Sequence, residues 1–315
     1  MAQQIIIDTD IGCDCDDAGA LAVAHALQHQ GKCFLRAVTH CTSRVDGCSA
    51  IEAINRYYGY PNIPTGVYRP NGLLDEESRK CYSRYIQQHY RTHFQKKADC
   101  PDAIAVLRQA LVESEKGNVS LIGIGPMVNL AGLLDSPGDH ISPLSGIDLV
   151  REKECPLFCM AACFDKALYP YLEECAEWNV KQAVPEAHHV FAAWPTEVYV
   201  IPFETGYDIL TGGSLLESPE SNPVRVSYEQ FGEIMRCSWD PCTVHFAVTR
   251  SEKYWKMSEP GFVTILENGV SVFEPNQYGR HKIVYAKDKE VVASCLEELI
   301  GWMPEHVLQP SRFVV

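Results

Sequence analysis

The sequence reads IIIDTDIGCDCDDAGALAVAHAL over residues 5–27, and this stretch decides the fold. The three isoleucines predict a short buried β-strand, and the apolar run after the last aspartate predicts a helix that ends near Gly31. A strand that leads directly into a helix is typical of a βαβ unit with parallel strands. The loop between the two elements holds five carboxylates within ten positions: Asp8, Asp10, Asp14, Asp16 and Asp17.

The rest of the chain continues the alternation of strands and helices. Further strands are expected within residues 33–40, 118–125, 155–164 and 197–204, and helices within 46–59, 101–117, 126–135 and 289–303. Asn268-Gly269 stands between two β-rich runs and predicts a β-hairpin over 262–275. We therefore expect one α/β domain over residues 1–315, with a mostly parallel central sheet flanked by helices and a C-terminal β-hairpin and helix.

The predicted topology also places the acidic loop. In open parallel sheets, ligands bind at the carboxyl ends of the strands. Residues 8–17, the loop after Gly125 and the residues that follow the 155–164 strand should therefore meet at one edge of the sheet.

Composition and charge exclude several classes of partner. Hydrophobic residues make up 46% and charged residues 22% of the chain, and no apolar run approaches the roughly 20 residues that span a bilayer. The N-terminus lacks the basic and apolar regions of a signal peptide. The formal net charge of −14 argues against nucleic-acid binding and against a polybasic membrane contact. We expect a soluble cytoplasmic protein.

The 14 cysteines favour reduced, mostly structural thiols over a disulfide framework. Disulfide frameworks belong to short secreted chains, and this chain is long and shows no secretion signal. No C-x-x-C occurs in the sequence, so zinc is not expected.

Several interpretations of the aspartates compete. Extra carboxylates at a helix N-terminus would account for Asp16 and Asp17 but not for the other three. An EF-hand loop counted from Asp8 would need glycine and glutamate where Cys13 and Gly19 stand. A haloacid-dehalogenase-like phosphatase also begins with a strand and D-x-D, but it leaves the later aspartates unexplained. Clustered oxygen ligands without Cys/His pairs favour a Ca²⁺ or Mg²⁺ site.

Four segments in sequence order carry a family resemblance. D-T-D-x-G-x-D-x-D-D-A-x-A-L resembles the signature of the inosine–uridine nucleoside hydrolase family, with two extra residues between the glycine and the paired aspartates. Three later segments resemble further motifs of that family: GIGPMVNLAGLL, CPLFCMA with EWNV, and RCSWDPCTVHFAV. With EAINRYYGYPNIPTG, the resemblance covers about residues 4–250.

This resemblance implies hydrolysis of the N-glycosidic bond of ribonucleosides to ribose and free base, with one Ca²⁺, in homodimers or homotetramers. Asp10 would be both a metal ligand and the general base that takes a proton from water. The other metal ligands would be Asp17, Asp240 and the carbonyl of Val128. Because the loop is two residues longer than in the family, the alignment can be made from the paired aspartates or from Gly12. The first alignment selects Asp17 and the second selects Asp14, so either Asp14 or Asp17 completes the metal site.

The resemblance also assigns substrate contacts. Asp16 would bind the vicinal ribose hydroxyls, Glu177 and Asn179 the 5′-hydroxyl, and Met160 would pack against the sugar. The family usually has an asparagine that positions the water, and here Ser43 or Thr42 would replace it.

Leaving-group chemistry is where this sequence departs from the family. Many members have a histidine before the last metal-binding aspartate, and this chain has Trp239. Purine-preferring members stack a tryptophan on the base there, which predicts a purine-leaning enzyme of nucleoside salvage. Tyr82, Tyr85 or Tyr90 could supply a second aromatic wall. Two alternatives stay open: a metal-dependent phosphatase, and an inactive homologue that binds nucleoside or calcium.

Overall fold

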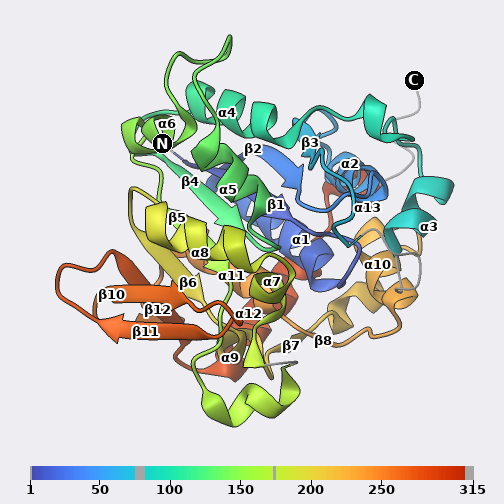
Figure 1. Cartoon of the computed structure of the whole chain (residues 1–315). Helices are drawn as coiled ribbons and strands as arrows, with labels where there is room; N and C mark the ends of the chain where they lie inside the picture. The colour runs from blue at the N-terminus through green and yellow to red at the C-terminus, as the bar shows by residue number, and fades with distance from the viewer. Residues whose placement is uncertain (1, 75–81, 173–174, 309–315) are drawn as a thin grey trace.

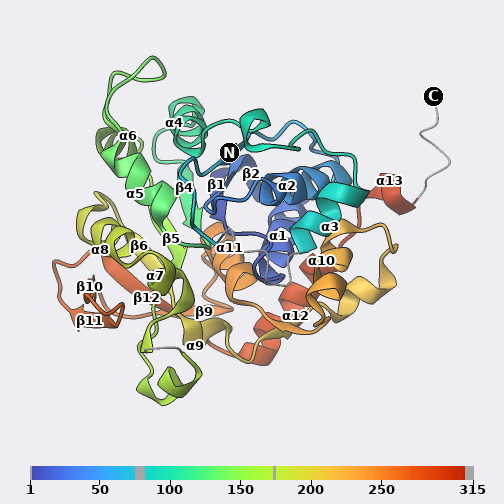
Figure 2. The same ribbon diagram turned by 45° about the vertical axis from the view of Figure 1, so that its right-hand side comes forward.

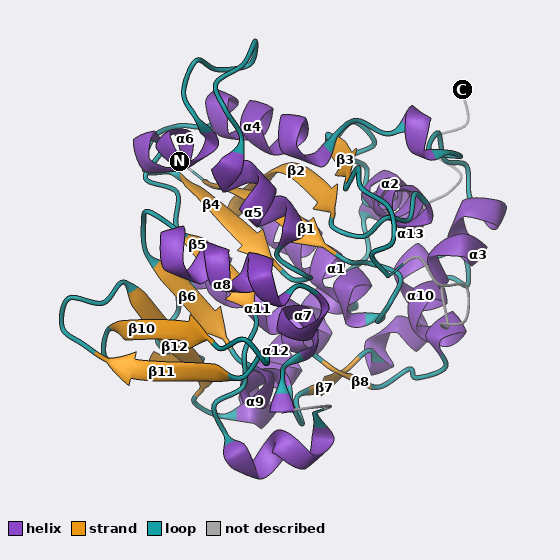
Figure 3. Ribbon diagram, viewed as in Figure 1, coloured by secondary structure: helices purple, strands orange, loops and turns teal. Residues whose placement is uncertain are grey.

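The central feature of the computed structural model is a large twisted sheet (Figures 1 and 3). The structure describes residues 2–74, 82–172 and 175–308. Neighbouring strands follow the order β11-β10-β12-β6-β5-β4-β1-β2-β3, and β9 pairs with β12. The strands of this sheet are β1 Gln3–Thr9, β2 Cys33–His40, β3 Thr65–Val67, β4 Val119–Gly123, β5 Leu157–Met160, β6 Val198–Ile201, β9 Trp255–Met257, β10 Gly261–Ile265, β11 Ser271–Pro275 and β12 His281–Ala286.

All pairings from β12 across to β3 are parallel, whereas β9, β10 and β11 are antiparallel to their neighbours. The predicted mostly parallel sheet is therefore confirmed, and so is the hairpin β10–β11. Gly269 in the hairpin turn has φ 81° and donates its N–H to the carbonyl of Leu266 at 2.8 Å. This left-handed conformation explains the Asn-Gly signal. A separate two-stranded sheet pairs β7 (Leu210–Thr211) with β8 (Arg236–Cys237).

Helices cover both faces of the sheet (Figure 2). Among the described residues, none of them is long and apolar enough to cross a membrane. The α-helices are α1 Asp16–His29, α2 Asp46–Tyr57, α3 Tyr82–His89, α4 Ala103–Glu113, α5 Val128–Asp135, α6 Gly146–Glu152, α7 Trp178–Gln182, α8 Val184–Ala193, α9 Phe203–Gly206, α10 Pro223–Phe231, α11 Trp239–Thr249, α12 Lys289–Ile300 and α13 Glu305–Leu308. Short 3₁₀ turns occupy Lys97–Asp99, Lys166–Tyr171 and Gly213–Glu217.

The isoleucines of β1 contribute to two apolar cores, one on each face of the sheet. Successive strand side chains point to opposite faces. Ile5 and Ile7 pack into one core with α1, α2, α10, α11 and α12, whereas Ile6 packs into the other core with α4, α5, α6 and α8. All three isoleucines are fully buried. A continuous apolar run is thus the pattern that a strand covered on both faces requires.

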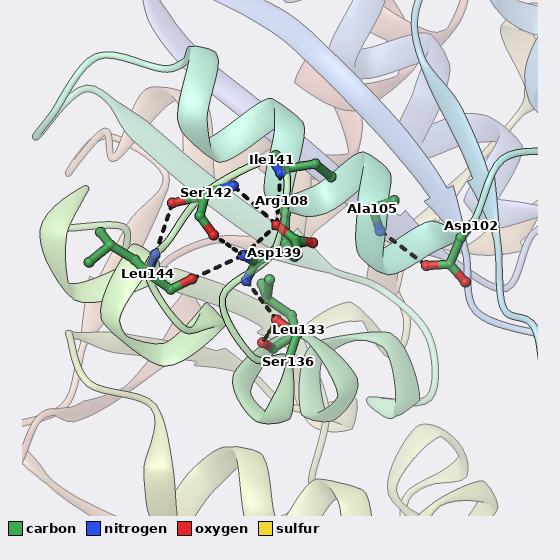
Figure 4. Close-up of polar contacts among 9 residues, drawn as sticks. All are labelled: Asp102, Ala105, Arg108, Leu133, Ser136, Asp139, Ile141, Ser142 and Leu144. Carbon is green, nitrogen blue, oxygen red and sulfur yellow. Dashed lines mark hydrogen bonds and ion pairs between the residues drawn. The ribbon is translucent and has the colours of Figure 1, made fainter.

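A buried arginine anchors the loop that follows α5 (Figure 4). Arg108 on α4 is 1% exposed, and its Nε and Nη2 donate to the carboxylate of Asp139 at 3.1 and 3.0 Å. Its remaining bonds go to the hydroxyl of Ser136 and to two backbone carbonyls of the loop. Helix α4 itself begins after Asp102, which accepts from the N–H of Ala105 at 3.0 Å and caps the helix.

The cysteines of the described residues are all free, and most of them are buried. Cys81 lies outside the described residues. Buried thiols in strands such as Cys159 pack as small apolar side chains.

Candidate active site

The carboxyl ends of the parallel strands meet around one cavity of ≈ 420 Å³. Residues after β1, β4, β5 and β6 all contribute to it, as expected for the carboxyl edge of the sheet, although of the loop after β4 only Ile124, before Gly125, lines it. A volume of this size is in the usual range for small-molecule sites. The lining residues are Asp10, Cys13, Asp14, Asp16, Asp17, Ile124, Met160, Tyr171, Leu172, Ala176, Glu177, Trp178, Asn179, Lys181, Phe203, Phe231, Arg236, Trp239 and Asp240.

Three buried carboxylates form the floor of the cavity. Asp16 and Asp17 lie in the first turn of α1 and Asp240 in the first turn of α11, and oxygens of all three lie within 4.8 Å of one another. The hydroxyl of Thr9 donates to Asp17, and the N–H of Asp240 donates to Asp16 at 3.1 Å. Burial and the neighbouring negative charges raise the pKa of each carboxyl well above its usual value. Such a cluster of hard oxygen donors fits a divalent cation, whose charge would offset their repulsion.

Asp10 lies at the same end of the cavity but is not one of these three. Burial, together with the charges of Asp14 and Glu177, raises its pKa to about 7. A Cβ added to Gly125 would lie 2.8 Å from both the backbone nitrogen and Oδ1 of Asp10, so the loop after β4 packs directly on this side chain. Val128 begins α5 and packs beside Cys41, and it is not one of the cavity-lining residues.

Asp14 lines the cavity but is already paired. Nε of Arg236 donates to Oδ1 of Asp14 at 3.0 Å, and Nη2 donates to Oδ2. The same oxygen Oδ1 accepts from the N–H of Cys15 at 2.7 Å. We therefore remove Asp14 from the candidate metal ligands, because a cation would have to compete with an arginine for both of its oxygens.

Ser43 also leaves the candidate site. Its hydroxyl donates to the carbonyl of Pro70 at 3.1 Å and accepts from the N–H of Leu73 at 2.9 Å, so it holds the loop that follows β3. The hydroxyl of Thr42 is buried and accepts from the N–H of Arg44 at 3.3 Å. Neither residue lines the cavity.

Asp8 has a bracing role at the end of β1. Its Oδ1 accepts from the hydroxyl of Thr39 at 2.5 Å and from Nδ2 of Asn129 at 2.8 Å, which ties β1 to β2 and α5. Burial raises the pKa of Asp8 to about 7. Asp8 thus joins three elements of the fold.

The second group of polar residues comes from α7. Glu177 caps this helix: its Oε1 accepts from Asn179 N–H at 2.9 Å, and its Oε2 accepts from Val180 N–H at 3.2 Å and Ala162 N–H at 3.3 Å. The backbone N–H of Trp178 also bonds to this carboxylate, so four N–H groups hold Glu177 in place at the cavity wall. Nδ2 of Asn179 donates to the carbonyl of Met160 at 3.1 Å. This leaves Oδ1 of Asn179 as an acceptor without a partner among the described residues.

Aromatic side chains form another wall of the cavity, called the aromatic wall below. The Trp239 ring stacks on Phe203 with 5.3 Å between centroids, and its Nε1 donates to the Phe203 carbonyl at 2.9 Å. Phe231 and Tyr171 complete this wall. The three tyrosines expected there do not line the cavity. Tyr82 is buried under the acidic loop, Tyr85 stacks on His89, and Tyr90 bonds to the Ser221 carbonyl.

The fold and the site together define an α/β protein with an acidic centre of the cation-binding type at the carboxyl edge of a parallel sheet. The chain belongs to the inosine-uridine preferring nucleoside hydrolase family, whose model matches residues 5–293. Members of this family are glycosidases that act on N-glycosyl compounds. Family membership leaves the phosphatase interpretation without support.

Solved structures with the same fold agree with this assignment. An inosine-uridine preferring nucleoside hydrolase from Bacillus anthracis has a TM-score of 0.71 at 18% identity, over 95% of this chain and 99% of that chain. A plant nucleoside hydrolase has a TM-score of 0.70 at 18% identity, over 96% and 99% of the two chains. A purine-preferring ribonucleoside hydrolase from Gardnerella vaginalis has a TM-score of 0.68 at 15% identity, over 95% and 99%. No curated protein matches the sequence significantly.

Proposed function

We propose that this chain hydrolyses the N-glycosidic bond of purine ribonucleosides to ribose and free base, with Ca²⁺ as its cation, in cytoplasmic nucleoside salvage. One observation carries the proposal: a single cavity is lined by a carboxylate cluster, by sugar-type hydrogen-bond acceptors and by an aromatic wall. A ribonucleoside has matching parts, with a polyhydroxylated sugar joined to a flat base. As in the family, we expect a homodimer or homotetramer.

Asp16, Asp17 and Asp240 are the side chains that fit a cation. We propose Asp17 and Asp240 as direct ligands, with Asp10 and the Val128 carbonyl completing the set. A bound Ca²⁺ would supply Lewis-acid chemistry, since it lowers the pKa of water and orients the ribose hydroxyls. Oxygen-only donors favour Ca²⁺ or Mg²⁺ over zinc.

Asp10 acts in this proposal as the general base. It takes a proton from the attacking water while the water oxygen bonds to C1′ of the ribose. The bond between C1′ and the base nitrogen breaks, and its electron pair leaves with the base. Positive charge develops on the sugar, and the carboxylates around it stabilise that charge more strongly than they stabilise the neutral ribose.

The ribose would be held at both ends. Asp16 accepts from the vicinal hydroxyls, and Glu177 and Asn179 accept from the 5′-hydroxyl. Met160 is 5% exposed, lines the cavity and would pack against the sugar ring.

The purine preference rests on the aromatic wall. Trp239, Phe203 and Phe231 offer a large apolar surface, which suits a two-ring base better than a one-ring base. The purine-preferring enzyme from Gardnerella vaginalis has the same fold, which supports the proposal by analogy.

The test is release of reducing sugar from a panel of nucleosides, with Ca²⁺ and after chelation. Wild type should release ribose only with the cation, and fastest from purine nucleosides. Asp10→Ala should abolish release, whereas the matched control Asp135→Ala, which removes an exposed carboxylate of α5, should not change it. If Ca²⁺ binds but no nucleoside is cleaved, the chain is a binding homologue and the proposed activity is wrong.

A further inference from the structure

Arg236 brings a positive charge to the aromatic wall of the cavity. Its guanidinium carbon lies 5.3 Å from the centre of the Trp239 ring and 5.1 Å from that of Phe231. It lines the cavity, and its side chain is 24% exposed. Arg236 therefore lies beside the two aromatic rings against which the base of a nucleoside would pack.

Trp239 itself cannot donate a hydrogen bond to that base. The indole has a single N–H, and this group is already bonded to the carbonyl of Phe203 at 2.9 Å. The tryptophan therefore contributes apolar surface only, and a polar contact to the base must come from another residue.

Arg236 has donors to spare. A guanidinium has five N–H groups. Two of them bind Asp14, and a third, on Nη1, binds Oε2 of Glu233 at 2.9 Å. The other two, one on each terminal nitrogen, have no acceptor among the described residues. The two carboxylates and the rings hold the guanidinium in place, so these donors are pre-organised for a ligand.

We propose that Arg236 contacts the leaving base and makes the enzyme selective for 6-oxopurine nucleosides. This proposal rests on the proposed nucleosidase function and adds a residue and a substrate class to it. A 6-oxopurine presents two adjacent acceptors, N7 and O6, and a pair of arginine N–H groups fits them in a bidentate arrangement. Adenine presents N7 beside an amino group, and arginine has no acceptor for that amino group.

The same contact assists bond cleavage. When the bond between C1′ and N9 breaks, its electron pair passes to the purine, and negative charge spreads to N7 and O6. The guanidinium stabilises that charge by hydrogen bonding, and the base then takes its proton from solvent. Arginine stays protonated throughout, so it acts as an electrostatic group and not as a general acid.

The experiment compares four substrates: inosine, adenosine, 7-deazainosine and p-nitrophenyl β-D-riboside. Nitrophenolate is a good leaving group with no purine edge, so its riboside reports on the sugar and cation machinery alone. The variants are Arg236→Gln and the control Arg151→Gln, which changes an exposed arginine of α6.

Wild type should prefer inosine to adenosine by about 10–100-fold in kcat/KM, the range for one bidentate base contact. Arg236→Gln should lower kcat/KM for inosine by about 10²–10³-fold, the cost of losing one pre-organised donor. The same variant should cleave the nitrophenyl riboside almost as fast as wild type, and Arg151→Gln should behave as wild type on every substrate.

An equal loss on inosine and on the nitrophenyl riboside would make Arg236 a structural residue and overturn the proposal. If Arg236→Gln does not fold, wild type alone decides: 7-deazainosine lacks the N7 acceptor, and cleavage at the inosine rate would exclude the contact. Equal rates on adenosine and inosine would exclude the 6-oxopurine selectivity. If the enzyme cleaves the nitrophenyl riboside but none of the nucleosides, the proposed base contact is wrong. If it cleaves none of the four substrates, the proposed function itself is wrong.

Discussion

Asp14 and Arg236 form a two-point ion pair between residues that lie 222 positions apart in the chain. The pair ties the loop after β1 to the short strand β8. Tyr82 holds the same loop from below, since its hydroxyl accepts from the N–H of Gly12 at 3.0 Å and donates to the carbonyl of Asp14 at 2.8 Å. The long loop is thus fixed through side chain and backbone, and the guanidinium of Arg236 neutralises the charge of Asp14 without a metal ion.

This pairing separates the two aspartates that compete for the metal. Asp17→Asn should weaken Ca²⁺ binding by more than about 100-fold, because even partners in the outer shell of a metal site are worth about 10–100-fold. Asp14→Asn should leave the Ca²⁺ affinity nearly unchanged, because its oxygens are bonded to Arg236. Calorimetric titration with Ca²⁺ measures both affinities. A larger loss for Asp14→Asn than for Asp17→Asn would return Asp14 to the metal site.

The contact between Glu177 and the 5′-hydroxyl can be tested by changing both partners. Removing the hydroxyl, as in 5′-deoxyinosine, should lower kcat/KM of wild type by about 10–100-fold, the value of a hydrogen bond to a charged group. Glu177→Gln should lower the activity on inosine by a similar factor. The two losses should not add when both changes are combined, because each removes the same bond. If instead the variant lost activity on 5′-deoxyinosine by the product of the two single factors, Glu177 would act only as the cap of α7.

The sequence predicted the parts of this molecule that depend on local pattern. Ile5, Ile6 and Ile7 identify a strand buried on both faces, and the rule that ligands gather at strand ends brought the loop after β1, the loop after β4 and the residues after β5 to one cavity. Asp240 and Glu177 could be placed there only through the family resemblance, because no local pattern links them to the acidic loop.

The residues that sequence reasoning missed depend on distant contacts. Arg236 lies on a two-residue strand, which is too short to show any periodicity. Phe203 lies two residues after the end of β6, so the rule that ligands bind at the carboxyl ends of strands could have found it. Nothing in the sequence excluded Ser43 from the site. Only the structure shows that its hydroxyl is hydrogen-bonded to the backbone of Pro70 and Leu73.

Arg108 should be important for stability and not for catalysis. Arg108→Met would leave the buried carbonyl of Ser142, the part-buried carbonyl of Leu144 and the Ser136 hydroxyl without their donor (Figure 4). Each unpaired buried group costs about 1–3 kcal/mol, so we expect a loss of about 2–4 kcal/mol in the free energy of unfolding. Urea unfolding measures the loss, and Arg151→Met on the surface of α6 is the control. An unfolding free energy equal to that of wild type would show that other contacts hold the loop.

The partner of Arg108 gives this stability a pH dependence. The hydrogen bonds from Arg108 hold the pKa of Asp139 at about 2, below its usual value of 3.8. A carboxyl whose pKa is lower in the folded state stabilises the fold above its unfolded pKa and loses that effect as the pH falls. The contribution of Asp139 should therefore be complete above about pH 4 and disappear as the pH falls to about 2. Asp139→Asn should unfold with a weaker dependence on pH in this window, as melting curves at several pH values would show.

The position of Asp10 should depend on the absence of a side chain at Gly125. A Cβ at Gly125 would lie 2.6 Å from the Cys41 sulfur and 2.8 Å from two atoms of Asp10, so Gly125→Ala must displace the proposed base. A displacement of about 1 Å can cost about 100-fold in rate, so kcat on inosine should fall by about that factor while the fold persists. Gly132→Ala on α5 is the matched control, because its Cβ would meet only the end of the Ile104 side chain at 3.0 Å. Circular dichroism establishes the fold of both variants. An unchanged kcat in a folded Gly125→Ala enzyme would mean that the geometry of Asp10 does not limit the reaction, and the general base would have to be sought among the other carboxylates of the cavity.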